Sequence, residues 1–198
     1  MRIGKRRGGL VRNIIILMSG AAVAQAIAFL ASPALGRLYE PAAYGVYGAF
    51  SSVVAIALSV ATLRYDLAVV LPKKDGDAAN VLGVAVAVVC ATTILVAVVC
   101  LLMRNWIAQV MRSPGLAGLV WLVPVDIFFA GLFAALNSWA IRRKAFRLTS
   151  QSRVTNAVFT SGTQIAAGAK GAGALGLVGG TVMGDAFGAI ALGAAVLK

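Results

Sequence analysis

The chain has 198 residues, of which 61% are hydrophobic and only 12% are charged, far fewer charges than a soluble domain carries. It contains no His, so histidine metal sites, Ser-His-Asp triads and histidine acid–base catalysis are excluded. A formal net charge of +12 would indicate nucleic acid in a soluble protein. Here the basic residues lie between long apolar runs, so we interpret them as determinants of membrane orientation and expect no nucleic-acid partner. The composition predicts an integral membrane protein.

Six segments are apolar enough, and nearly free of charge, to cross a bilayer as helices of about 20 residues. Pro41, Pro72 and Pro114 fall between them. Pro124 is an exception, because it lies inside the fourth segment and should kink that helix. We therefore predict an all-α membrane protein in which residues 1–198 form a single bundle of six transmembrane helices. The predicted helices cover about 13–36, 44–64, 79–102, 115–139, 149–169 and 173–197.

The connections between these helices differ strongly in positive charge. Most of the 18 Lys and Arg residues fall on the side of the two termini. They lie in the segment up to and including Arg12, from Arg64 to Lys74, from Arg142 to Arg153, and at Lys198. Cytoplasmic loops carry an excess of Lys and Arg, so both termini are expected in the cytoplasm. The cations expected on the opposite side are Arg37, Arg104, Arg112 and Lys170.

Two acidic residues interrupt the apolar runs. Asp126 lies at the midpoint of the run 113–141, and Asp185 lies in the last helix. An acid at the bilayer centre is costly, so both are expected to face the bundle interior or a wet cavity. Each is interpreted either as a contact in the substrate or ion path or as a hydrogen-bond partner for a neighbouring helix.

Glycines recur every four residues along the last helix, at Gly176, Gly180, Gly184 and Gly188. This spacing lines one face of a helix with hydrogen atoms in place of side chains, which is typical of close helix packing in membranes. We predict a packing face there, with a hinge for bundle rearrangement as the alternative.

The fifth helix carries a polar stripe with helical periodicity. A stripe of this kind is typical of a helix that lines a water-filled cavity, although polar contacts between helices are the alternative. Gln25, in the middle of the first helix, is a similar candidate. The stripe consists of Thr149, Arg153, Asn156, Thr160, Thr163 and Gln164.

Arg64 and Asp66 lie at the end of the second helix, near the expected cytoplasmic interface. They are too close in sequence to share a helix face as an ion pair. A cation at a cavity mouth suits a phosphate-bearing substrate, and ordinary anchoring at the interface is the alternative.

Three segments resemble bacterial polysaccharide (O-antigen type) flippases, which belong to the multidrug/oligosaccharidyl-lipid/polysaccharide exporter superfamily. These segments are Arg37-Leu-Tyr-Glu-Pro-x3-Gly45-x-Tyr47, Leu63-Arg-Tyr-Asp-Leu-Ala-Val-Val-Leu-Pro72, and Asn137-Ser-Trp-Ala-Ile-Arg142-Arg-Lys-x-Phe146. The resemblance implies two six-helix lobes around a central cavity. This chain resembles the N-terminal lobe, so a second six-helix chain is expected to supply the other.

The resemblance implies a transporter half that flips a lipid-linked oligosaccharide across the bacterial inner membrane for surface polysaccharide biosynthesis. Membrane lipids and the lipid-linked oligosaccharide are the expected partners. The residues leave two alternatives open: half of a drug/cation antiporter, or a non-transporting truncated fragment or assembly subunit. We expect no enzymatic activity, no cofactor and no metal site.

Overall fold

The computed structural model describes residues 3–61 and 75–196, with the side chains of 15–59 and 79–196. Six long helices fill this part of the chain, with one short 3-10 helix, η1, before α5 and no strand among the described residues. Their bounds are α1 Ile3–Leu38, α2 Pro41–Ala61, α4 Asp75–Val110, η1 Pro114–Gly118, α5 Leu122–Arg142, α6 Phe146–Ala169 and α7 Gly173–Val196. The predicted all-α membrane bundle is confirmed.

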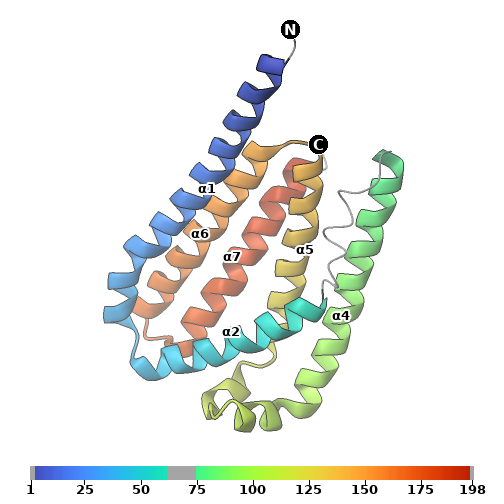
Figure 1. Ribbon diagram of the computed structural model, residues 1–198. Helices are drawn as coiled ribbons and strands as arrows, with labels where there is room; N and C mark the ends of the chain where they lie inside the picture. Colours follow the sequence, from blue (N-terminus) through green and yellow to red (C-terminus); the bar gives the residue numbers. More distant parts are fainter. Residues whose placement is uncertain (1–2, 62–74, 197–198) are drawn as a thin grey trace.

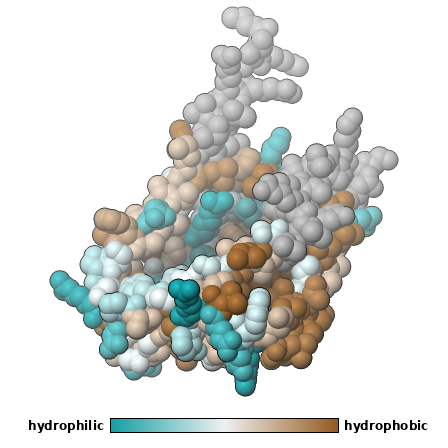
Figure 2. Space-filling view, turned by 60° about the horizontal axis from the view of Figure 1, so that its bottom comes forward, coloured by the Kyte–Doolittle hydropathy of each residue, from teal (hydrophilic) through white to brown (hydrophobic). Residues whose placement is uncertain are grey.

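The start of α1 and the end of α7 lie at the same end of the bundle, called here the upper end (Figure 1). Helix α6 lies between α1 and α7, and α5 lies between α7 and α4. Helix α2 runs obliquely across the lower part of the bundle, where it contacts α7, α5 and α4. Figure 2 shows hydrophilic side chains around the lower end and further hydrophilic surface in a hollow bordered by apolar residues.

Five of the described helices are long and apolar enough to cross a membrane, which makes the chain a multi-pass membrane protein. They expose large apolar side chains, such as Phe29 and Leu30 on α1 and Leu102 on α4, as helices in lipid do. Helix α6 is not among the five because its polar residues lower its hydropathy. It nevertheless lies along α1 and α7 within the bundle, at the position of the expected fifth span.

The predicted kink at Pro124 is wrong. Helix α5 begins at Leu122, so Pro124 occupies its first turn, where a backbone N–H has no partner within the helix and proline is tolerated. The break in this region lies earlier, at Met103 of α4, whose backbone is non-helical. Helix α4 continues past this break to Val110, beyond the predicted end at residue 102. The chain then turns through η1, and the helix that was expected to begin at residue 115 begins at Leu122.

The largest apolar core lies where α2 crosses the bundle. Phe50 of α2, Leu116 of η1 and Val123 of α5 are almost completely buried there, together with Val178 of α7. Burying a side chain of this kind contributes about 1.5–3 kcal/mol relative to leaving it in water. The turn between α4 and α5 is thereby fixed against α7.

The four glycines of α7 face α6. A Cβ at Gly184 would overlap the hydroxyl of Thr160 and lie 2.9 Å from the carbonyl oxygen of Asn156, and one at Gly180 would lie 3.1 Å from the carbonyl oxygen of Thr160. Gly176 and Gly188 also meet neighbouring atoms. Because backbone atoms occupy this space, the two helices approach as closely as they do only with glycine at these positions.

We expect Gly184→Ala to destabilise the protein by about 1–3 kcal/mol, because the added methyl group forces α6 away from α7. Thermal unfolding in detergent measures this loss. Gly179→Ala is the matched control: it lies on the same helix, and a Cβ there meets nothing within 4 Å. An equal effect of the two substitutions would contradict the packing role of the glycine face.

Candidate functional site

A groove with a volume of about 470 Å³ lies between α1 and α6, with one side chain from α5. Helix α1 contributes three alanines and Gln25, so its side of the groove is formed mainly by small methyl side chains. Helix α6 contributes polar side chains, among them Arg153, Asn156 and Thr160. The lining residues are Ala21, Ala24, Gln25, Ala28, Phe133, Arg153, Asn156, Ala157, Thr160 and Ser161.

The groove lies midway along the span Ile15–Leu38 of α1, so its polar atoms are at the depth of the bilayer interior. Arg153 and Gln25 are exposed within it, while Asn156 and Thr160 are half-buried. Amide and hydroxyl groups bind sugars and phosphate oxygens through hydrogen bonds, and arginine adds a positive charge. The groove therefore suits a polar, negatively charged group.

A chain of polar contacts leads from the groove to α7 and α5. The Asn156 amide donates a hydrogen bond to Asp185 Oδ1 at 2.7 Å, and the Thr160 hydroxyl is 3.5 Å from Asn156 Oδ1. The side chain of Asp185 in turn contacts the carboxyl group of Asp126 at hydrogen-bonding range. The structure thus joins both predicted acids to the groove through one residue, Asn156.

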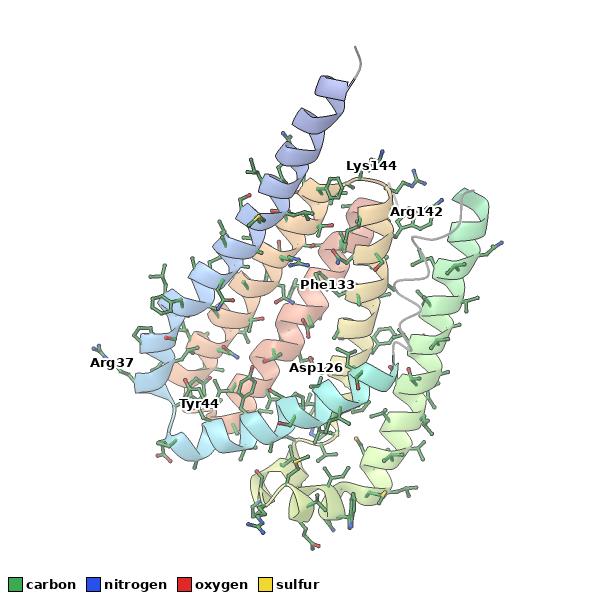
Figure 3. The ribbon with its side chains drawn as sticks, in the orientation of Figure 1. Arg37, Tyr44, Asp126, Phe133, Arg142 and Lys144 are labelled. Atoms are coloured by element: carbon green, nitrogen blue, oxygen red, sulfur yellow. The ribbon has the colours of Figure 1, made fainter. Side chains whose placement is uncertain are left out.

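Asp126 is only 2% exposed, but it does not lie at the middle of its helix as expected. It is one turn inside α5, because that helix begins at Leu122. Figure 3 shows it in the lower part of α5, below Phe133, whereas Arg142 and Lys144 lie at the upper end. Its Oδ1 atom is buried and has no hydrogen-bond partner.

Gln164 belongs to helix packing and does not line the groove. It is buried, and its Nε2 donates to the backbone oxygen of Leu177 on α7 at 3.0 Å. The Tyr39 hydroxyl, from the turn after α1, donates to the backbone oxygen of Gln164 at 2.6 Å. Burial raises the pKa of Tyr39, with a smaller contribution from Tyr44, so the phenol remains a donor. These two bonds connect α1, α6 and α7.

Of the predicted site residues, the structure brings together Gln25, Asn156 and Thr160 in the groove, and Asp126 with Asp185 behind it. Thr149, from the predicted stripe, is fully buried away from the groove. Arg64 and Asp66 lie outside the described residues.

Two residues of the groove, Ser161 and Phe133, are not among the residues predicted for the site. Arg153 belongs to the predicted polar stripe and is also among the cations expected on the cytoplasmic side. Helix α6 begins at Phe146, earlier than the predicted residue 149, so Arg153 lies about two turns inside it. Phe133 carries no signal in the sequence that separates it from the lipid-facing aromatic residues.

These features define a multi-pass α-helical membrane protein with a polar, cationic groove at the depth of the bilayer. Residues 34–196 match the family described as polysaccharide biosynthesis protein. This match covers most of the chain, so the chain belongs to that family, and the resemblance seen in the sequence is confirmed. No curated protein and no solved structure matches the chain significantly.

We expect Tyr39→Phe to lower the free energy of unfolding by about 0.5–1.5 kcal/mol, because it removes one hydrogen bond between α1 and α6. The measurement is thermal unfolding in detergent. Tyr44→Phe is the control, since Tyr44 is exposed and packs edge-on against Tyr39. Equal stability of the Tyr39→Phe variant and the wild type would show that this bond does not hold α1 in place.

Proposed function

We propose that the chain is one helical lobe of a transporter that moves a lipid-linked oligosaccharide across the bacterial inner membrane for surface polysaccharide biosynthesis. Membership of the polysaccharide biosynthesis family and the apolar spans support this proposal. The observation that carries it is Arg153, a cation held in a polar groove between transmembrane helices.

A lipid-linked sugar has three parts that need different surroundings: an apolar tail, a phosphate or pyrophosphate linker, and the sugar itself. The guanidinium of Arg153 can bind phosphate oxygens through two parallel hydrogen bonds. Gln25, Asn156 and Thr160 offer amide and hydroxyl groups to sugar hydroxyls. On the same helix as Gln25, the exposed side chains of Val23, Phe29 and Leu30 suit contact with the lipid tail.

The groove is open at Gln25 and Arg153, which leaves room for a facing wall. We propose that a second six-helix bundle supplies this wall. Rocking of one bundle against the other would then expose the groove to each side of the membrane in turn. We assign the chain no catalytic step, since its polar side chains serve to bind and shield the substrate during transfer.

The test is equilibrium binding of a polyprenyl-pyrophosphate-linked oligosaccharide to the purified full chain in detergent. Replacing a charged hydrogen-bond partner costs about 1.5–3 kcal/mol, so Arg153→Ala should weaken binding about 10- to 100-fold. Arg153→Lys should retain part of the affinity. Arg147→Ala is the matched control, because Arg147 is an exposed arginine of the same helix outside the groove.

Three outcomes would contradict the proposal. Equal binding by wild type and Arg153→Ala would remove the groove from substrate recognition. Preference for a lipophilic cation over the pyrophosphate-linked sugar would favour a drug/cation antiporter. Binding of neither class would favour a non-transporting assembly subunit.

We further propose that both ends of the chain face the cytoplasm. The upper end, where α1 begins and α7 ends, also carries Arg142 and Lys144, whereas Arg37 lies at the lower end. A reporter that is active only in the cytoplasm should give a signal when fused to the C-terminus. A reporter that is active only in the periplasm should give none at the same position. A fusion after Lys170 should give the reverse result, and the same result at both positions would contradict this orientation.

A further inference from the structure

Two carboxyl groups lie against each other inside the bundle. Asp126 of α5 and Asp185 of α7 are within hydrogen-bonding range, and Asp126 is 2% exposed. A carboxylate has only acceptor atoms, so two of them at this range repel unless one carries a proton and donates it to the other. A hydrogen bond between the two side chains therefore needs a proton on one of them.

The surroundings decide which carboxyl group bears the charge. Asp185 Oδ1 accepts a 2.7 Å hydrogen bond from the Asn156 amide, which stabilises a negative charge on that group. Asp126 has no such donor, and its Oδ1 is buried without a hydrogen-bond partner. A neutral carboxylic acid tolerates this environment far better than a carboxylate does. Asp126 is thus the donor of the pair and Asp185 the acceptor.

The helices packed around the pair bring few other charged or titratable groups. Arg153 lies on the groove side of Asn156, one turn along α6. Tyr47 of α2 contacts Thr181, one turn before Asp185 on α7. The stretch of α4 from 79 to 102, the part of α1 from 15 to 36 and the stretch of α2 from 41 to 59 contain no charged residue.

We propose that Asp126 and Asp185 form a proton-binding site that holds one proton between them, and that Asn156 links the occupancy of this site to the groove. When the site is emptied, the O–H bond of Asp126 breaks and the proton passes to water in the groove. Two adjacent carboxylates then remain, and their repulsion acts on Asn156, which both binds Asp185 and lines the groove. Loss of the proton therefore changes the surface that contacts the substrate.

The role of this site in coupling rests on the proposed transport function, but the proton can be detected without transport. The experiment is infrared spectroscopy of the purified full chain in lipid, which resolves the C=O stretch of a protonated carboxyl group. We expect this band near neutral pH in the wild type and its loss at higher pH. Labelling aspartate at its side-chain carbon should shift the band, which assigns it to an aspartic acid.

Asp126→Asn should abolish the band, because Asp185 then accepts only hydrogen bonds from amides and has no need of a proton. Asn156→Leu should shift its frequency by removing the donor to Asp185. Glu40→Gln is the control, since Glu40 is exposed in the turn between α1 and α2. Asp185→Asn is the second test of the pair if the Asp126 variant does not fold, and it should alter the band by replacing the carboxylate acceptor with a neutral amide.

The proposal is overturned if the labelled wild type shows no protonated aspartic acid near neutral pH, or if the band survives Asp126→Asn and is unchanged by Asp185→Asn. It is also overturned if sodium added at constant pH removes the band, because the site would then bind sodium in place of the proton. These results are independent of whether Arg153 binds a lipid-linked sugar, so failure of one proposal is distinguishable from failure of the other.

Discussion

The structure depends on how a polar helix is kept inside a lipid bilayer. Helix α6 is too polar to be recognised as a span, so its amide and hydroxyl groups need partners within the protein. The glycine face of α7 allows α6 to approach closely enough for these polar groups to reach α7. With no side chains between the two helices, Gln164 reaches the backbone of α7 and Asn156 reaches Asp185.

This packing also explains why the lower part of α6 is packed against its neighbours while its higher part borders a groove. The Tyr39 hydroxyl and the Gln164 side-chain amide hold the lower part of α6 to α1 and α7 through hydrogen bonds to backbone oxygens. Higher along the helix, α1 presents Ala21, Ala24 and Ala28, which are too small to fill the space. A polar groove results, and Arg153 and Asn156 line it.

The acid pair fits the same arrangement. Asp126 of α5 and Asp185 of α7 lie behind the groove. Asp185 is bonded to Asn156, which lines the groove, and Asp126 contacts Asp185. A change of charge at the pair acts on neighbouring polar groups through a low-dielectric interior, where electrostatic interactions are stronger than in water. The groove and the buried acids are thus two parts of one polar network.

Much of this could be predicted from the sequence. Hydropathy and charge gave the number and order of the helices, because lipid imposes length and composition on each segment that crosses it. The period of the polar stripe placed Asn156 and Thr160 on one face, and the four-residue spacing of glycines placed Gly180 and Gly184 against a neighbour. Family membership followed from motifs in the connections and helix ends.

Other features could not be predicted, because they depend on where helices begin and on which faces meet. The turn through η1 delays the start of α5, which moves Pro124 into the first turn and Asp126 toward the helix end. The earlier start of α6 places Arg153 about two turns inside the helix, where it lines the groove. The sequence by itself determined a membrane bundle with buried acids and a polar stripe, since these follow from local composition. Only the tertiary structure decided that Asp126 meets Asp185 and that Gln164 packs while Asn156 lines the groove, since helix periodicity fixes a side chain's direction but not what lies opposite it.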